Sequence, residues 1–323
     1  MCRSEINLGE SVKNKIALFC NVQKKAVVES IDTESIYNVP ILLQKQGLDL
    51  EVLKKLKINK YSKPNLRKWN TFLNRLHSPK KETCIAVVGK YVELRDSYKS
   101  IYEALIHAGV QTNCKINVEW VHSNNVNKKE VKNIFKKCSG IIVAPGFGER
   151  DIQGKLDSIE YARVNKVPFL GICLGMQMAV VEFARNVLKL NNADSTEMNL
   201  KTKHPIIDLM EGQKSISRKG GTMRLGSYNC NLLPNSKSFL AYSKKNISER
   251  HRHRYEFNNN YIDLIEEKGM KCVGFNPSSN LVEIVEIEKH PWFVGVQFHP
   301  EYKSTVIKPH PLFVAFLQAT INK

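Results

Sequence analysis

The stretch Pro168-Phe169-Leu170-Gly171-Ile172-Cys173-Leu174-Gly175-Met176-Gln177 decides the fold. Its apolar first half predicts a buried strand over residues 167–171, and an apolar helix is expected to begin directly after Cys173. The two glycines that flank Ile172-Cys173-Leu174 permit the sharp strand-to-helix turn that exposes a nucleophile at the end of a strand. A thiol at this point lies at a helix N-terminus, where backbone N–H groups favour the thiolate. The pattern predicts a catalytic cysteine and disfavours the alternative, a buried structural thiol.

Outward from this turn, segments with strand character alternate with segments of helical spacing. We expect strands over residues 84–89, 116–121 and 140–144, and helices over 131–135 and 156–164. A further helix is predicted from an N-cap at Asp96 to a stop at Gly109. Hairpin-like strands follow over residues 281–287 and 292–298. The alternation predicts an α/β fold with a doubly wound, mostly parallel sheet.

A thiolate nucleophile needs a partner that exchanges a proton near neutral pH, most often a histidine. Among nine histidines, His299 stands directly after a predicted strand, in Gln297-Phe298-His299-Pro300-Glu301. Glu301, two residues on, is placed to orient the imidazole. By itself, the His-Pro-Glu run also fits a surface turn with an exposed glutamate. Together with the cysteine turn earlier in the chain, it specifically indicates a catalytic histidine.

A glycine-containing loop, Val143-Ala144-Pro145-Gly146-Phe147-Gly148, follows another predicted strand. Glycine lets backbone N–H groups approach a ligand closely, so Gly146 is a candidate oxyanion donor together with the N–H of Leu174. The alternative is an ordinary Pro-Gly turn.

The chain is expected to divide into residues 1–57, a linker over 58–82, and a large domain over 83–323. The first segment contains a predicted strand over residues 15–20 and a predicted helix over 39–46. We interpret it as a fragment of a second α/β domain, because it is too small to bury a core alone. An amphipathic helix is predicted over residues 65–76.

The composition fits a globular cytosolic protein, with 42% hydrophobic and 25% charged residues. No apolar run reaches membrane-spanning length, and no secretory signal is predicted. None of the eight cysteines forms a C-x-x-C pair, so no metal site is expected. The net charge of +18 is spread along the chain, which favours a solvated basic surface over a nucleic-acid interface.

Residues 171–177 together with Phe298-His299-Pro300-Glu301 resemble the triad-type class I glutamine amidotransferases. The run Gly220-Gly221-Thr222-Met223-Arg224-Leu225-Gly226 and the run Glu249-Arg250-His251-Arg252-His253-Arg254-Tyr255-Glu256 are similar to those of CTP synthases. The resemblance covers essentially the whole chain, and it implies the flavodoxin-like version of the α/β fold.

The resemblance implies a role for each matching residue. Cys173 matches the nucleophile, His299 the acid–base and Glu301 the orienting carboxylate. The positions that match the glutamine site are Gly146, Leu174, Gly175, Met176, Gln177, Glu197 and Arg254. An arginine suits the α-carboxylate of glutamine, and a glutamate suits its ammonium group.

The family also implies ligands beyond L-glutamine, namely UTP, ATP with Mg²⁺, and GTP as an allosteric activator. Lys15 matches a position that contacts UTP and ATP, and Ile31, Asp32 and Thr33 match positions near the adenine. These residues are expected to form an incomplete nucleotide site. The family further implies a homotetramer for the complete enzyme, and ammonia from glutamine is expected to convert UTP to CTP.

The sequence departs from the family pattern at two places. Ala144-Pro145-Gly146 stands where Pro-Gly-Gly is usual, although the oxyanion position Gly146 is kept. Asp151 follows Arg150 where the family has glycine, and its negative charge is expected to weaken the response to GTP.

Three alternatives stay open. The chain can be a non-catalytic remnant or a regulatory partner of a full-length CTP synthase, or it can work with a separate polypeptide that supplies the synthetase part. A cysteine hydrolase that acts on γ-glutamyl or peptide bonds would share the Cys-His-Glu arrangement, but the two CTP-synthase-like runs argue against it.

Overall fold

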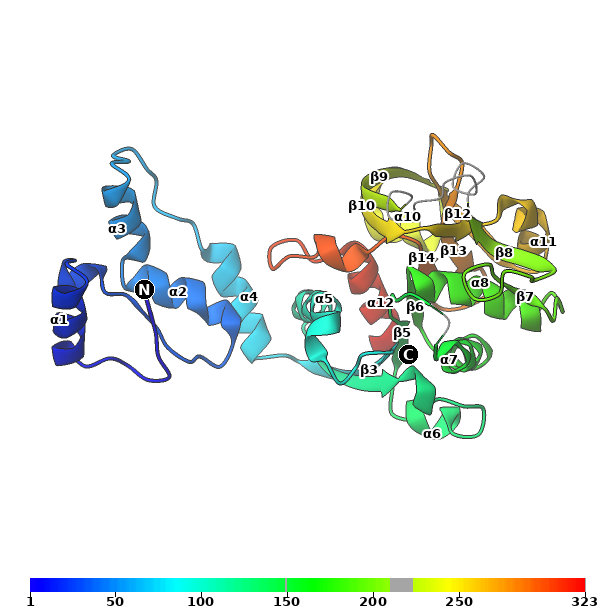
Figure 1. The fold of residues 1–323 in the computed structure, drawn as a ribbon, viewed down its shortest axis with the longest axis horizontal. Coiled ribbons are helices and arrows are strands. Elements are labelled where there is room, and N and C mark those ends of the chain that lie inside the picture. The colour runs from blue at the N-terminus through cyan, green and yellow to red at the C-terminus, as the bar shows by residue number, and fades with distance from the viewer. Residues whose placement is uncertain (149, 210–222, 323) are drawn as a thin grey trace. The chain divides into compact units, whose positions relative to one another are not determined.

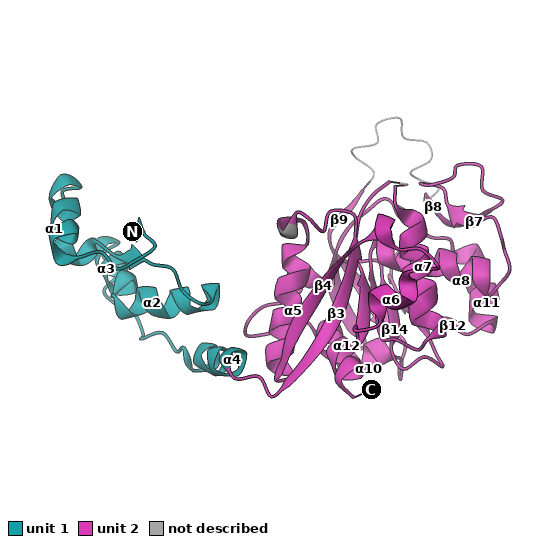
Figure 2. Cartoon of the chain, turned by 90° about the horizontal axis from the view of Figure 1, so that it is seen from below, with its two compact units in different colours: residues 1–77 teal, residues 78–323 magenta. Residues whose placement is uncertain are grey.

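The computed structural model describes residues 1–148, 150–209 and 223–322. Gly220, Gly221 and Thr222 of the family run lie outside the described residues. The chain forms two compact units, residues 1–77 and 78–323 (Figure 2). No helix in the described ranges is both long and apolar enough to cross a membrane.

The first unit is built from four α-helices and a short parallel strand pair. The helices are α1 (Glu10–Phe19), α2 (Val39–Lys45), α3 (Leu48–Lys55) and α4 (Arg67–His77), and β1 (Cys2–Arg3) pairs with β2 (Glu29–Ser30). The ring of Tyr37 meets that of Phe72 edge-on at 4.9 Å, and Trp69 Nε1 donates to the Tyr37 carbonyl at 2.8 Å. These contacts hold α4 in the unit. The helices predicted over residues 39–46 and 65–76 are confirmed.

The strand predicted over residues 15–20 is wrong, because these residues lie on and just after α1. A short apolar run cannot be assigned to helix or strand from periodicity alone. Only Ala17 of this helix is buried, while Leu18 and Phe19 are exposed. The apolar residues therefore do not mark a strand in a sheet.

A nine-stranded sheet forms the centre of the second unit, in the order β10-β9-β12-β13-β14-β6-β5-β3-β4 (Figure 1). The strands from β14 to β4 run parallel: β14 (Phe293–Val296), β6 (Phe169–Ile172), β5 (Gly140–Val143), β3 (Lys81–Gly89) and β4 (Cys114–His122). This half confirms the predicted α/β fold. The other half is antiparallel, and it contains β13 (Val282–Ile287), β12 (Met270–Phe275), β9 (Arg224–Leu232) and β10 (Asn246–His253).

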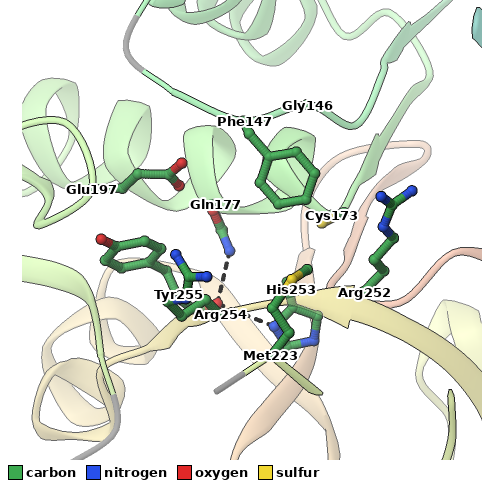
Figure 3. A pocket seen from close by; sticks show the side chains of 10 residues that line it. All are labelled: Gly146, Phe147, Cys173, Gln177, Glu197, Met223, Arg252, His253, Arg254 and Tyr255. Atoms are coloured by element: carbon green, nitrogen blue, oxygen red, sulfur yellow. Dashed lines mark hydrogen bonds between the residues drawn. The ribbon is translucent and has the colours of Figure 1, made fainter. Parts of the chain in front are cut away.

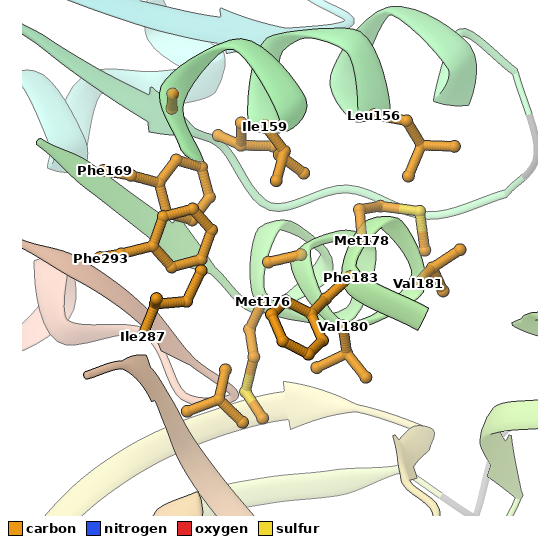
Figure 4. Packing of buried hydrophobic residues seen from close by; sticks show 14 of the residues in the cluster. Leu156, Ile159, Phe169, Met176, Met178, Val180, Val181, Phe183, Ile287 and Phe293 are labelled. Atoms are coloured by element: carbon orange, nitrogen blue, oxygen red, sulfur yellow. The ribbon is translucent and has the colours of Figure 1, made fainter. Parts of the chain in front are cut away.

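Successive residues of the parallel strands point into two different cores, as a doubly wound sheet requires. In β3, Ala86 and Val88 belong to the core that contains α7 (Ile152–Val164) and α8 (Leu174–Asn186), as shown in Figure 4. Ile85 and Val87 belong to the opposite core with α5 (Lys99–Gln111) and α12 (Pro311–Ile321). Strands β5, β6 and β14 and the second half of β3 are thus buried on both faces, whereas the edge strand β4 keeps exposed residues.

The predicted boundaries of α5 are wrong at both ends. A 3₁₀ turn over Arg95–Tyr98 precedes the helix, whose N-cap is Tyr98 rather than Asp96. Gly109 lies inside the helix, where a Cβ atom would come within 2.7 Å of the Cys114 carbonyl oxygen. This glycine permits close packing against β4, and Asn113 with φ 56° makes the turn instead.

A small three-stranded sheet and short helices complete the unit. The small sheet has the order β11 (Tyr255–Phe257), β8 (His204–Leu209) and β7 (Ala193–Ser195). The remaining α-helices of the described residues are α6 (Val131–Phe135), α10 (Lys237–Tyr242) and α11 (Ile262–Glu267). Strand β11 follows β10 directly, so the chain passes from the large sheet to the small one near residue 254.

Replacing Phe293 by alanine is expected to lower the free energy of unfolding of the second unit by about 3–5 kcal/mol. Phe293 on β14 stacks on Phe169 of β6 with ring centroids 4.3 Å apart, and both rings are fully buried (Figure 4). Denaturant unfolding followed by far-ultraviolet circular dichroism measures the change. The matched control is Leu240→Ala at an exposed side chain, expected within about 0.5 kcal/mol of wild type. Equal effects of the two substitutions would contradict the assignment of Phe293 to the core.

Candidate active site

The turn between β6 and α8 holds Cys173 in a backbone conformation that is rare for any residue with a side chain. Its φ is 53° and its ψ is −104°. A Cβ atom on Gly171 would lie 2.7 Å from the Gly175 carbonyl oxygen, and one on Gly175 would lie 2.2 Å from the Val143 carbonyl oxygen. The two glycines are therefore required by close backbone packing around the turn. A strained residue at a strand-to-helix turn is the backbone geometry of a nucleophile elbow.

The backbone of Cys173 connects the turn to the neighbouring strand. Its N–H donates to the carbonyl of Val296 in β14 at 2.8 Å, and its carbonyl accepts from the N–H of Gln177 at 3.2 Å. Cys173 occupies the N-cap position of α8 and is 3% exposed. Because β14 runs parallel to β6, residues that follow β14 emerge beside the thiol.

His299 follows β14 and is buried next to Cys173. Its Nδ1 donates to Glu301 Oε1 at 2.8 Å, and its backbone N–H donates to the Arg250 carbonyl at 2.8 Å. The imidazole also stacks on the ring of Tyr302, with centroids 5.1 Å apart. The hydrogen bond to Glu301 fixes the ring so that Nε2 is left for proton exchange.

The charges around His299 favour its protonated form. Burial alone would lower the pKa of this imidazole, but the neighbouring Cys173 and the Glu301 carboxylate raise it well above the usual range. By contrast, burial and nearby cations lower the pKa of His253, which lines the cavity. The site therefore keeps one imidazolium beside the thiol and a neutral imidazole in the wall.

The loop after β5 faces Cys173 from the other side. Glu197 Oε1 accepts from the Gly148 N–H at 2.8 Å, and Lys90 Nζ donates to the Phe147 and Gly148 carbonyls at 2.7 and 2.9 Å. We call residues 144–148 the oxyanion loop. Hydrogen bonds to Glu197 and from Lys90 therefore hold the backbone of this loop.

A cavity of about 340 Å³ opens in front of the thiol (Figure 3). Its walls come from the oxyanion loop, from α8 and from the segment that joins β10 to β11. The lining residues are Gly146, Phe147, Cys173, Gln177, Glu197, Met223, Arg252, His253, Arg254 and Tyr255. One anionic and two cationic side chains thus share one cavity with a thiol, which suits a zwitterionic amino acid.

Gln177 lines the cavity, and the fully buried Gln297 lies behind it. Gln177 Nε2 donates to the Tyr255 carbonyl at 2.9 Å and to Gln297 Oε1 at 3.2 Å. Gln297 Nε2 lies 3.8 Å from the Cys173 sulfur. Gln177 therefore connects α8 to β11 and reaches the thiol through Gln297.

The structure brings together most of the predicted site residues. Cys173, Gly146, Gln177, Glu197 and Arg254 line the cavity. Leu174 begins α8, Gly175 packs against β5, and the Met176 side chain lies in the hydrophobic core (Figure 4).

The predicted nucleotide contacts lie in the first unit. Lys15 is exposed on α1, and Thr33 Oγ1 donates to the Ser35 carbonyl at 2.8 Å. Asp32 forms an ion pair with Arg3, and Ile31 precedes it.

Several lining residues were missed by the sequence analysis. Arg252, His253 and Tyr255 belong to the run 249–256, from which only Arg254 was selected. Gln297 stands two residues before His299, so the strand period of two places it on the same side. Lys90 belongs to the run Val88-Gly89-Lys90-Tyr91, which is similar to CTP synthases, although no site role was predicted for it; Lys155 carries no sequence signal that points to the site.

Among residues 1–148, 150–209 and 223–322, no cluster of three or more His, Cys, Asp or Glu side chains could hold a metal ion.

Two family models match the chain. The model of the class-I glutamine amidotransferases matches residues 93–319, and that of the CTP synthase N-terminus matches residues 1–58. The chain is similar to a CTP synthase of Christiangramia forsetii, with 55% identity over 99% of the chain and 58% of the relative. It is also similar to one of Flavobacterium johnsoniae, with 54% identity over 100% of the chain and 60% of the relative. The chain therefore spans somewhat less than two thirds of the length of these curated relatives.

A solved structure resembles the second unit. The glutaminase domain of Trypanosoma brucei CTPS with bound acivicin is 32% identical and superposes with a TM-score of 0.71. The match covers 75% of this chain and 94% of that domain.

The substitution Glu301→Gln is expected to lower the pKa of His299, because it removes a carboxylate that favours the imidazolium. His299 should then lose its proton at a lower pH than in the wild type. The shift is measured by titration of the imidazole resonances by NMR, over a pH range that covers the raised pKa of His299, about 11, and the lowered pKa of His290. His290 is the internal control: burial lowers its pKa to about 4, and its ring bonds to the Ala162 carbonyl. An unchanged titration of His299 would contradict the prediction.

Proposed function

The chain belongs to the class I glutamine amidotransferases and, within them, to the CTP synthases, and on this premise we propose that its second unit hydrolyses L-glutamine. The observation that carries the proposal is the strained turn that presents the Cys173 thiol to a 340 Å³ cavity, with the hydrogen-bonded pair His299–Glu301 behind it. These are the parts that nucleophilic catalysis of acyl transfer requires.

In the proposed reaction, the thiol proton of Cys173 passes to His299, and the resulting thiolate attacks the side-chain amide carbon of glutamine. A C–S bond forms, and the amide oxygen takes up negative charge that backbone N–H groups of Gly146 and Leu174 stabilise. His299 then gives its proton to the departing nitrogen, the C–N bond breaks and ammonia leaves. Water, deprotonated by the same imidazole, attacks the thioester and releases glutamate with the free thiol.

The cavity walls are suited to the two charged groups of the amino acid. We propose that Arg254 binds the α-carboxylate and Glu197 the α-ammonium group of glutamine. Glu197 also accepts from the Gly148 N–H, so one side chain contacts both the substrate and the oxyanion loop. Gln177 and the backbone at the start of α8 complete the site.

The reaction that consumes the ammonia is proposed from the family to which the chain belongs. The curated relatives are CTP synthases, and each has a segment that this chain does not match. We propose that ammonia released at Cys173 aminates UTP with ATP and Mg²⁺ on such a segment, present in a longer chain or in a separate polypeptide. GTP is the expected activator, and a homotetramer the expected assembly.

The first unit offers a surface for such a partner. Leu18 and Phe19 on α1 are 78% and 86% exposed, and Leu56 at the end of α3 is 65% exposed. Exposed apolar side chains that cluster on one element mark interaction surfaces. We propose that a synthetase polypeptide covers these exposed apolar side chains. The proposal is the same for a chain that supplies ammonia and for one that acts as a regulatory partner.

The purified chain is expected to release glutamate from glutamine, and Cys173→Ala should reduce kcat by at least about 10³-fold because the nucleophile is lost. A coupled assay for glutamate measures the rate. Cys20→Ala, at an exposed thiol in the first unit, is the matched control and should keep the wild-type rate. Glutamate release that persists in Cys173→Ala would contradict the proposed nucleophile.

The double substitution Leu18→Ser and Phe19→Ser is expected to reduce self-association or partner binding, because it removes exposed apolar area. Light scattering after size exclusion, with and without a synthetase polypeptide, measures the assembled mass. Val164→Ser, at a 60% exposed residue of the second unit, serves as the control. A wild-type chain that is monomeric and binds no synthetase polypeptide would contradict the proposed surface.

A further inference from the structure

Two buried lysines contact the oxyanion loop on the side away from the cavity lining. Lys90 follows β3 and is 6% exposed, while Lys155 on α7 is fully buried. Neither lines the cavity in front of Cys173. The reaction proposed above uses neither of them.

Lys90 is fixed at both its backbone and its side chain. Its N–H donates to the Tyr98 hydroxyl at 3.0 Å, and its Nζ donates to the carbonyls of Phe147 and Gly148. The direction of the Phe147 carbonyl sets the orientation of the peptide plane between Phe147 and Gly148. Lys90 thus restrains the C-terminal half of the oxyanion loop.

Lys155 contacts the N-terminal half of the same loop. Its Nζ lies 3.5 Å from the Ala144 carbonyl oxygen, and 3.5 Å from the point where a Cβ atom on Gly146 would stand. No carboxylate of the described residues forms a salt bridge with it. A buried ammonium without a carboxylate partner opposes folding, because burial removes its hydration.

We propose that Lys90 and Lys155 are positioning residues of the glutaminase site. Lys90 orients the peptide groups of the oxyanion loop, and Lys155 places a positive charge behind Gly146 when it is protonated. This charge favours the transition state, in which the amide oxygen becomes negative at the front of the same glycine. The inference rests on the proposed hydrolysis of glutamine.

The surroundings of Lys155 place its titration near neutral pH. Burial and the neighbouring Lys90 lower its pKa to about 7, although Cys173, Asp151 and Glu197 act in the opposite direction. Lys155 is therefore charged below about pH 7 and loses its charge above it. Its contribution to the rate should be largest on the acidic side.

Three substitutions test the proposal in the full chain: Lys155→Met, Lys90→Met and the control Lys271→Met. Lys271 also donates to a backbone carbonyl, that of Glu266 at 3.1 Å, but it lies on β12 and does not line the cavity. Glutamine hydrolysis is measured from pH 6 to pH 8.5 with thermal unfolding. Hydrogen–deuterium exchange is measured for peptides that contain residues 144–148.

Lys155→Met is expected to lower kcat about tenfold at pH 6.5 with KM changed less than about threefold, a smaller loss than removal of an oxyanion donor. The ratio of wild-type to variant kcat should shrink as the pH rises to 8. The melting temperature should stay equal or rise, because an uncompensated buried charge is removed. Lys90→Met should increase exchange in residues 144–148, and Lys271→Met should match the wild type in every measurement.

Equal kcat values of Lys155→Met and wild type at pH 6.5 would overturn the role of Lys155. A loss of kcat that is constant with pH and accompanied by a lower melting temperature would assign it a structural role instead. If the wild type hydrolyses no glutamine, the proposed function fails, and the exchange data still decide the positioning role. Faster exchange in Lys90→Met then supports it, and unchanged exchange overturns it.

Discussion

The backbone at Cys173 is the constraint on which the rest of the second unit depends. A residue with φ 53° and ψ −104° persists only where its surroundings leave no relaxed alternative. Here the surroundings are two backbone contacts that exclude any side chain, Gly171 against Gly175 and Gly175 against Val143. These contacts bring β5, β6 and α8 so close that the thiol can only point out of the sheet edge. The same proximity places the oxyanion loop, which continues β5, opposite the helix that begins after the thiol.

Much of this arrangement follows from the sequence because it is local. The glycine spacing around Cys173 and the position of His299 after a strand each involve neighbours along the chain, and both side chains meet at one sheet edge. Lys90 and Lys155 come from different elements, and only the packing of β3, β5 and α7 brings them to the same loop. For α1 the sequence prediction was wrong. Its apolar run predicts a strand, but these residues form a helix and most of them are exposed. Composition cannot show which surface a neighbouring chain segment covers.

The neighbours of each buried group, rather than its depth, decide which protonation state the site favours. His299 is kept protonated by a carboxylate and a thiol, whereas His253 is kept neutral by burial and by nearby cations. Lys155 lies between these extremes, because burial opposes its charge and the groups around Cys173 favour it. The two histidines thus favour different protonation states according to their neighbours, which the proposed proton exchange by His299 requires.

The cavity wall that carries Arg254 is held by an ion-pair network. This network joins the two runs that resemble CTP synthases, residues 220–226 and 249–256. Arg224 on β9 donates to Glu256 on β11 at 3.1 Å and to Glu283 on β13 at 2.8 Å. All three side chains are buried, so removing Arg224 would leave two buried carboxyl groups without their cationic partner. Arg224 belongs to the first run and Glu256 to the second, and their contact ties the small sheet to the large one. Because Arg254 and Tyr255 stand immediately before Glu256, the network sets the distance between this wall and Cys173. The runs that separate this family from other amidotransferases therefore place the wall as well as supply side chains that line the cavity.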